Sequence, residues 1–406
     1  MANQEVDLDA SIVARGLPDS GCATVKTAER SEIASFLVMD VMTAAAEREA
    51  AGYPVVHLEV GQPGTRAPLA AREAAKNAID NESLGYTLAL GMPALRERIA
   101  GHYQATYGVD LPPERVVVTS GSSAGFVLAF LALFDAGDRV ALPSPGYPCY
   151  RNILSALGQE YVTLETSPSN RWMPTVDQLG QSRNVRGLLI ASPNNPTGTM
   201  IEPNRLAALA AHCDANNQWL ISDEIYHGLT YGKPAETALK YSPNAIIINS
   251  FSKYFSMTGW RVGWMIVPEQ LVETVQRLAQ SLYICAPAIS QAAALGAFDS
   301  IPELEANRDV YQTNRELLLK GLSEIGVSEI VPADGALFLY ADVGQYTNDS
   351  LEFSKQMLAE TGVAATSGLD FDETRGCHFM RFCYSGPTSD MHDALARLSK
   401  WKRLKT

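Results

Sequence analysis

The sequence predicts an α/β protein with a mainly parallel central sheet flanked by helices, together with a smaller, discontinuous α+β domain. Two observations predict this fold. Between residues 115 and 250, short apolar runs rich in β-branched residues alternate with helical segments, and such alternation is typical of βαβ units. After Pro287 the alternation stops, and long amphipathic helices with isolated strands follow.

The first part of the chain is predicted to be mixed in structure. Residues 1–30 are polar and irregular and are expected to form an N-terminal arm or a disordered leader. Apolar residues then recur at helical spacing over residues 32–51, and residues 55–60 predict a strand. Further helices are expected over residues 70–79 and from Pro93, because proline is tolerated in the first turn of a helix.

The central region repeats one unit, a buried strand followed by a polar loop and a helix. Helices are predicted to begin near Ala124, Arg151 and Pro203. The predicted strands are residues 115–119, 139–142, 187–191, 219–222, 245–248 and 262–267. Ligands bind beyond the carboxyl ends of parallel strands. The polar loops SGSSAG, PSPGYPCY, SPNNPTG, DEIY and NSFSKYFSMTGWR should therefore meet at one sheet edge.

The C-terminal region predicts the smaller domain. Its elements are helices over residues 301–325 and 350–361, strands over residues 335–342 and around 378–383, and a closing helix from Ser389. We expect a large domain at residues 63–299. Residues 31–62 together with 300–406 are expected to form the small domain.

Composition excludes several classes of protein. The chain has 406 residues, a formal net charge of −13 and 46% hydrophobic residues, which fit a globular protein of two domains. A nucleic-acid-binding protein would carry a basic face instead. The longest apolar segment, residues 124–134, is too short for a membrane helix, which needs about 20 residues.

The six cysteines are scattered, without metal-type spacing, so we expect no metal site and reduced thiols. The start of the chain, MANQEVDLDA, is acidic and polar, unlike a signal peptide. Both features favour a cytoplasmic location.

Lys253 and Arg261 lie on the connection between two buried strands. A partly desolvated lysine has a readily shifted pKa, and Schiff-base chemistry needs such a lysine. A lone Ser-x-x-Lys is more often a solvated loop. Because the other polar clusters fall at the same sheet edge, the functional interpretation is favoured here.

The neighbouring loops carry residues that would bind a phosphate group near that lysine. Gly121, Ser122 and Ser123 open a predicted helix whose N-terminus would bind an anion, although a serine-rich turn is the alternative. Ser250 and Arg261 would add a hydroxyl and a guanidinium to the same phosphate.

Asp223 ends a buried strand, where its carboxylate requires a cation such as a protonated ring nitrogen. Tyr226 and Asn195 would bond a ring hydroxyl, and Tyr147 would stack on the ring. The alternatives are a helix cap for Asp223, a turn former for Asn195 and a core aromatic for Tyr147. A phosphate, a pyridinium and an aldehyde together specify pyridoxal phosphate.

The motifs SPNNPTG, SDEIY and NSFSKYFSMTGWR resemble those of fold-type I pyridoxal-phosphate enzymes, specifically class I/II aminotransferases of the aspartate aminotransferase superfamily. The resemblance extends from about residue 33 to the C-terminus. It implies Lys253 as the Schiff base and proton shuttle, Asp223 on the pyridine nitrogen, and Tyr226 and Asn195 on the phenolic oxygen. The implied phosphate and ring contacts are Gly121, Ser122, Ser123, Ser250, Arg261 and Tyr147.

The same resemblance implies three further roles. Tyr86, in YTLALGMPALR, would reach the phosphate of a neighbouring subunit, so a homodimer is implied. Arg381, in HFMRFCYSG, would hold the substrate α-carboxylate, with Gly61 beside it. The implied reaction moves the amino group of an L-amino acid to a 2-oxo acid, as part of amino acid biosynthesis.

Two alternatives share parts of this pattern. A pyridoxal-phosphate C–S lyase or cyclising synthase uses nearly the same cofactor residues. The sensor half of a transcription regulator resembles aminotransferases but follows a basic DNA-binding segment, whereas the first thirty residues here are acidic.

Substrate specificity is weakly marked in the sequence. Aspartate-preferring members of one subgroup carry a lysine where this chain has Ser123. The loop GQPGTRAP places Thr65 and Arg66 where an acidic and aromatic pair is usual, and Arg66 is expected to be a solvated arginine. We expect a neutral or aromatic donor, with pyruvate or 2-oxoglutarate as acceptor.

Overall fold

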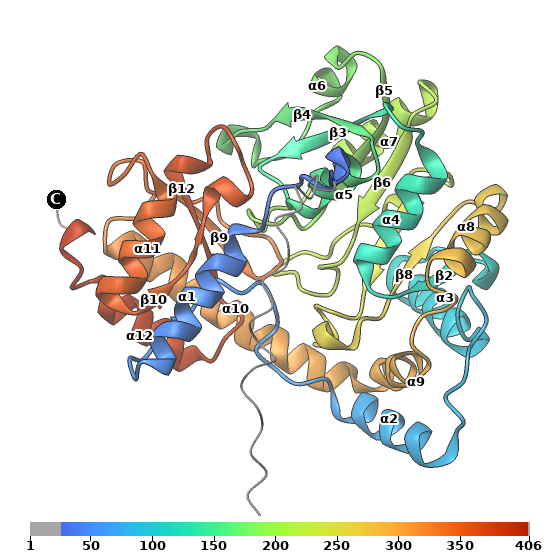
Figure 1. Ribbon diagram of the computed structural model, residues 1–406, viewed down its shortest axis with the longest axis horizontal. Helices are drawn as coiled ribbons and strands as arrows, with labels where there is room; N and C mark the ends of the chain where they lie inside the picture. The colour runs from blue at the N-terminus through green and yellow to red at the C-terminus, as the bar shows by residue number, and fades with distance from the viewer. Residues whose placement is uncertain (1–25, 405–406) are drawn as a thin grey trace, which may run out of the picture.

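The computed structural model describes residues 26–404. Most of the predicted N-terminal arm, residues 1–25, lies outside the described residues, and residues 26–30 are exposed. The rest forms a large domain around a seven-stranded sheet and a smaller domain beside it, which appears in blue, orange and red in Figure 1. The predicted fold class is confirmed.

The central sheet has the strand order β2-β8-β7-β6-β5-β3-β4. Its strands are β2 (Val116–Thr119), β3 (Arg139–Ser144), β4 (Glu160–Glu165), β5 (Val185–Ala191), β6 (Trp219–Asp223), β7 (Ile246–Ser250) and β8 (Gly263–Ile266). All neighbours are parallel except those of β8, which runs antiparallel between β2 and β7. The antiparallel turn brings Arg261, two residues before β8, to the carboxyl end of β7.

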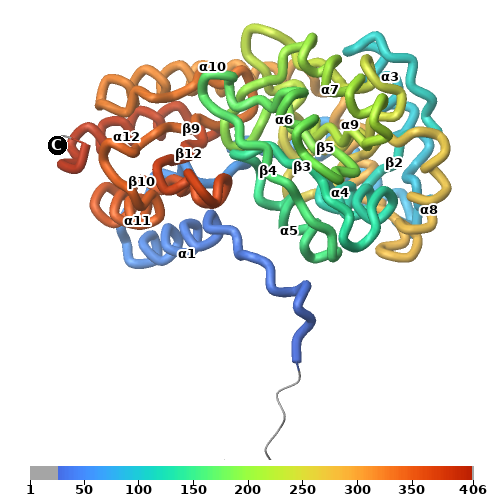
Figure 2. Tube along the Cα trace, turned by 90° about the horizontal axis from the view of Figure 1, so that it is seen from above, coloured from blue at the N-terminus to red at the C-terminus, as the bar shows by residue number. Residues whose placement is uncertain are grey.

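Helices cover both faces of this sheet (Figures 1 and 2). Buried side chains of α4 (Ser122–Leu133), α5 (Cys149–Ala156) and α8 (Glu269–Leu282) pack on one face. The other face meets α3 (Pro93–Tyr107), α6 (Val176–Gln181), α7 (Pro203–Ala215) and α9 (Ala288–Ala297), and α2 (Leu69–Asn81) packs on α9. Strands buried on both sides explain the continuous apolar runs in the sequence. Over residues 26–404, no helix combines the length and apolar character that crossing a membrane requires.

The small domain joins both ends of the described chain. β9 (Phe338–Asp342), β12 (Phe379–Cys383) and β11 (Thr366–Ser367) form an antiparallel sheet. β1 (Val56–His57) pairs in parallel with β10 (Val363–Ala364). The helices are α1 (Leu37–Ala50), α10 (Ile301–Glu324), α11 (Ser350–Thr361) and α12 (Thr388–Leu398). The β1–β10 pairing supports a discontinuous domain, although the proposed boundaries stay predictions.

Several elements differ from the sequence expectation. The strand predicted over residues 55–60 is only two residues long, and α1 begins at Leu37 instead of residue 32. β4, in which Leu164 is buried and the other residues are exposed or half-buried, was also not predicted, and neither were the helices α8 and α9. β4 lies at the sheet edge, where one side of a strand need not be apolar.

The contact between α2 and α9 depends on a glycine. A Cβ at Gly296 would lie 2.7 Å from the carbonyl oxygen of Ala70 and 2.8 Å from Cβ of Ala74, whereas a Cβ at Gly101 of α3 would meet nothing within 4 Å. Gly296→Ala should therefore lower the free energy of unfolding by about 1–3 kcal/mol. Gly101→Ala should raise it by about 0.5–1 kcal/mol. Denaturant titrations measure both, and equal effects would contradict the packing described here.

Candidate active site

A cavity of about 370 Å³ lies at the carboxyl ends of the central strands, where α1 and β12 of the small domain face the large domain. Ten residues that the sequence analysis selected line it together: Gly61, Ser122, Ser123, Tyr147, Asn195, Asp223, Tyr226, Lys253, Arg261 and Arg381. They come from segments distant in sequence, so the predicted convergence of polar loops at one sheet edge is what the structure shows.

Lys253 follows β7 by three residues, and its Nζ donates a hydrogen bond to the carbonyl oxygen of Gly61 at 2.5 Å. The ammonium lies 6.0 Å from the centroid of the Tyr226 ring. Burial lowers the pKa of Lys253 to about 8, against a smaller rise from Asp223. At pH 7 about a tenth of this side chain is therefore a neutral amine, which is the form that a nucleophile or base requires.

Asp223 is the last residue of β6 and is buried. Its Oδ2 accepts from the Tyr150 hydroxyl at 2.5 Å, and its Oδ1 accepts from the backbone N–H of Ile225 at 3.0 Å. Burial raises the pKa of Asp223 to about 6, although both hydrogen bonds and Lys253 lower it. A cation in the cavity would favour the ionised carboxylate further. Tyr150, in the first turn of α5, was missed by the sequence analysis, which selected Tyr147 two residues before this helix.

The N-terminus of α4 and Arg261 form an anion-binding region. Gly121 precedes α4 with φ of 78°, and a Cβ there would lie 2.4 Å from Nη2 of Arg261. Glycine is thus needed for both the conformation and the close approach of the guanidinium. Ser122 and Ser123 line the cavity beside Arg261. Helix N-termini with a nearby guanidinium suit a phosphate.

Ser250 lies behind this region and is not among the residues that line the cavity. Its Oγ lies 2.9 Å from Ser252 Oγ and 3.1 Å from the carbonyl oxygen of Val262, and its single proton is donated to one of these acceptors at a time. Ser252, which the sequence analysis did not select, lines the cavity instead. Direct contact of Ser250 with a phosphate stays a prediction.

Arg381 of β12 is buried at the opposite side of the cavity. Its Nη2 donates to the carbonyl oxygen of Glu59 at 2.6 Å, and its Nη1 donates to Asn195 Oδ1 at 3.1 Å. The guanidinium lies between two aromatic rings, 4.4 Å from the Phe338 centroid and 4.7 Å from that of Phe371. A planar cation held in this way presents a fixed fork to a carboxylate.

The two tyrosines of the predicted ring site differ in their surroundings. Tyr147 stacks on Phe36, with ring centroids 6.3 Å apart and an interplanar angle of 8°. Tyr226 is buried and meets Phe338 edge to face. Both line the cavity, so each combines a packing contact with an accessible polar end.

Tyr86 and Arg66 lie outside this cavity. The Tyr86 side chain is 83% exposed on the loop after α2. Arg66 is exposed and lines an adjoining open hollow with Thr65, whose hydroxyl bonds Ser256 and Tyr311. Neither residue contributes to the cavity of its own chain.

Glu224, directly after Asp223, is a buried carboxyl group that the sequence analysis did not select. Its Oε1 accepts from the hydroxyls of Ser222 and Thr237 and from the N–H of Ala238. Its Oε2 has no hydrogen-bond partner in the described part of the chain and lies 3.5 Å from Nδ1 of His227. Burial raises the pKa of Glu224 to about 8, so the group is mainly a neutral acid at pH 7.

Comparisons with known proteins agree with this geometry. The family model described as "Aminotransferase class I and II" matches residues 53–398. A valine–pyruvate aminotransferase of Mycobacterium tuberculosis is 49% identical over 93% of this chain and 99% of its own length. The crystal structure of an aminotransferase from the same organism superimposes with a TM-score of 0.92 at 49% identity, covering 93% of this chain and 99% of its own. An aspartate aminotransferase structure from Thermotoga maritima gives a TM-score of 0.86 at 30% identity, covering 92% and 99%.

Glu224 provides a prediction about stability and pH. Its pKa is about 8 in the folded chain and near 4.5 when unfolded, so the folded state retains a proton that the unfolded state releases. This contribution to stability is complete below pH 4.5 and is lost as pH rises toward 8. Relative to Glu224→Gln, the wild type should therefore lose up to about 1.4 kcal/mol of unfolding free energy per pH unit over this range.

Denaturant midpoints at pH 5.5 and 8 measure the effect, with Glu97→Gln, on the exposed face of α3, as the control. A wild type and Glu224→Gln that respond to pH in parallel would show that Glu224 is ionised in the folded chain.

Proposed function

The chain belongs to the aminotransferase class I and II family, and on that premise we propose that its cavity at Lys253 binds pyridoxal phosphate. Members of this family move an amino group between an amino acid and a 2-oxo acid, and this chain is therefore an aminotransferase. The observation that carries the cofactor proposal is that a lysine of lowered pKa and a buried carboxylate face one cavity.

The donor set fits the cofactor group by group. Asp223 lacks a cationic neighbour close enough to form an ion pair within residues 26–404, and a protonated ring nitrogen would supply one. Gly121 leaves room for the Arg261 guanidinium beside the first turn of α4, and a phosphate would bridge the two. We assign Ser122, Ser123 and Ser250 to the same phosphate, Tyr147 to the ring face, and Asn195 and Tyr226 to the ring hydroxyl.

When bound, pyridoxal phosphate supplies an aldehyde for amines and a protonated ring that takes up electron density from the substrate α-carbon. Lys253, as a neutral amine, would take the proton from the substrate α-carbon and deliver it to the aldehyde carbon of the cofactor. Asp223 remains ionised and keeps the proton on the ring nitrogen, while Tyr150 fixes the carboxylate orientation. Arg381 binds the α-carboxylate, and Asn195 and Gly61 border this contact.

We propose a neutral amino acid as the donor and pyruvate as one acceptor. The relative named valine–pyruvate aminotransferase is 49% identical over nearly its full length, and the cavity has apolar side chains at the wall made by α1. Such a donor also agrees with the serine at position 123, where a lysine marks one group of aspartate-preferring enzymes.

A homodimer is proposed on the exposure of one region. Leu69, Ile79 and Leu88 are 53%, 61% and 62% exposed along α2 and the following loop, and Tyr86 lies in the same loop. Exposed apolar side chains in one region are typical of a protein–protein interface. A second copy would cover them and carry Tyr86 to the neighbouring phosphate. We also propose a reducing, cytoplasmic setting, in which the unpaired cysteines of the described chain remain thiols, and a role in amino acid biosynthesis.

Substitution of Lys253 tests the reaction directly. Lys253→Ala should abolish the change in cofactor absorption that a donor amino acid produces in the wild type, because no amine remains to move the α-proton. A panel of amino acids, titrated into each protein without a 2-oxo acid, reports this half-reaction. Lys233→Ala, which removes an exposed lysine paired with Glu202, should behave as the wild type. Turnover by Lys253→Ala would refute the assigned role.

Mixed dimers test the role of Tyr86. Tyr86→Phe should weaken cofactor binding about tenfold or more, through loss of a hydrogen bond to a charged group. Mixing it with inactive Lys253→Ala should restore activity at limiting cofactor, because a hybrid has one site with Lys253 and the partner's Tyr86 intact. On random exchange, roughly a quarter of all sites regain both groups. Mixing with the double variant Lys253→Ala/Tyr86→Phe is the control, and recovery there would exclude the proposed arrangement.

A further inference from the structure

A short segment of the small domain, residues 370–375, is hydrogen-bonded to the large domain. Arg375 donates to the carbonyl oxygens of Thr166 and Ser144 at 2.7 and 3.1 Å. The carbonyl oxygen of Phe371 accepts from the N–H of Gly146 at 3.0 Å. Since Ser144 and Gly146 precede Tyr147, the segment is held against the loop that carries the proposed ring-stacking tyrosine.

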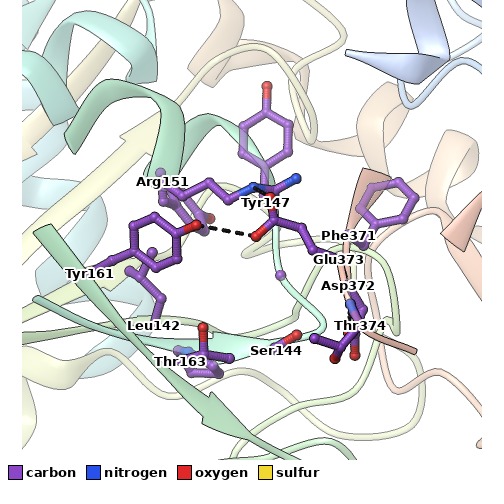
Figure 3. A pocket seen from close by; sticks show the side chains of 13 residues that line it. Leu142, Ser144, Tyr147, Arg151, Tyr161, Thr163, Phe371, Asp372, Glu373 and Thr374 are labelled. Carbon is purple, nitrogen blue, oxygen red and sulfur yellow. Dashed lines mark hydrogen bonds and ion pairs between the residues drawn. The ribbon is translucent and has the colours of Figure 1, made fainter. Parts of the chain in front are cut away.

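Figure 3 shows the outer side of this contact, where the segment borders a small cavity of about 60 Å³. Glu373 lies close to Tyr161 and Arg151, accepting from the Tyr161 hydroxyl at 3.1 Å and pairing with Arg151 at 3.5 Å. The Nη2 atom of Arg151 also donates to the carbonyl oxygen of Asp370 at 2.9 Å. Contacts on both sides therefore fix the backbone at position 370.

From this position the Asp370 carboxylate caps α1. Oδ1 accepts from the N–H of Leu37 at 3.1 Å, and Oδ2 accepts from the N–H of Val38 at 3.3 Å. The residue at the ordinary cap position, Phe36, makes no side-chain cap and stacks on Tyr147 instead. The first turn of α1 thus depends on a carboxylate 333 residues later in the chain, and a negative charge there is favourable to the helix.

The turn held by Asp370 forms one wall of the active-site cavity. Val38, Met39 and Met42 of α1 line the cavity, whereas Asp40 faces a different hollow between α1 and α11. Met39 is 53% exposed, which leaves its side chain free to adapt to a ligand. The wall that α1 presents to the cavity is therefore apolar.

The charged residues that line this cavity already have tasks in the proposed function. Lys253, Asp223 and Arg261 serve the cofactor, and Arg381 serves the α-carboxylate. Arg66 lines the adjoining hollow and not this cavity. Within residues 26–404, the lining thus offers no further cation to a second substrate carboxylate.

We propose that Asp370 is a positioning residue, which holds α1 so that Val38, Met39 and Met42 receive an uncharged, apolar substrate side chain. The inference rests on the proposed function, since it concerns the substrate of the same site. Phe371, next in the chain, packs on the Arg381 guanidinium. One segment therefore sets both the distance and the orientation between the α-carboxylate contact and the side-chain wall.

Three variants test this proposal. Asp370→Leu removes both acceptors, Asp370→Asn keeps one oxygen that accepts an N–H, and Glu373→Gln changes the same segment without touching α1. Two quantities are measured in each cofactor-loaded protein. They are hydrogen exchange of the peptide spanning residues 35–42, and the ratio of kcat/KM for valine to that for alanine.

In Asp370→Leu, the amide hydrogens of the first turn of α1 should exchange at least about tenfold faster than in the wild type. The ratio of kcat/KM for valine to that for alanine should fall about tenfold, as expected for a lost apolar contact. The loss should fall on KM more than on kcat. Asp370→Asn should lie between this variant and the wild type. Glu373→Gln keeps an acceptor for Tyr161 and leaves the hydrogen bonds of Arg151 and Arg375 in place, so it should stay close to the wild type. Native exchange and a native ratio in Asp370→Leu would overturn the proposal.

A second substitution keeps the inference testable if Asp370→Leu does not fold. Met42→Lys places a cation in the wall, so it should lower kcat/KM for valine about tenfold and raise that for aspartate relative to valine. An unchanged preference would refute the role of the wall. Turnover of alanine distinguishes the positioning role of Asp370 from the proposed function. It should persist in every variant described here. Its absence from the wild type would refute the proposed function itself.

Discussion

The burial of Asp223 is the constraint on which the site depends. A carboxylate removed from water is costly unless charges and hydrogen bonds compensate it. Tyr150 and the N–H of Ile225 satisfy part of the group, and its pKa is still raised by burial. The structure thus holds an acceptor whose charge needs a cation in the cavity, and the protonated ring of the proposed pyridoxal phosphate would supply that cation.

The sheet explains how Lys253 and the phosphate region come to face this carboxylate. β6 and β7 are parallel neighbours, so the residues after their carboxyl ends lie side by side. The antiparallel β8 then returns the chain to that edge, which brings Arg261 next to Gly121 at the start of α4. Backbone hydrogen bonds of buried strands position these groups, and little of their placement is left to flexible loops.

Those residues could be predicted because each follows a continuous apolar run. Asp223 is the last residue of a buried strand, and Lys253 and Asn195 follow other buried strands within four residues. The end of such a run is visible in a sequence. The start of α1 was not predictable, because its cap is the distant Asp370. Tyr150 was missed because its partner, Asp223, lies on a strand distant in the sequence. Glu224 was missed because the sequence alone does not distinguish a buried, neutral glutamic acid from a solvated surface glutamate.

The residues proposed for the cofactor and those proposed for the substrate come mainly from different domains. Groups proposed for the cofactor lie at the ends of central strands and at the start of α4, whereas Arg381 and the α1 wall belong to the small domain. The contacts that place α1 are hydrogen bonds of its first-turn amides and the stacking of Phe36 on Tyr147. Because Tyr147 is also the proposed ring-stacking residue, a ring bound there would be connected to the start of α1 through a single aromatic contact. The proposed substrate wall is thus linked to the proposed cofactor site by packing, and Asn195 belongs to both sets of residues.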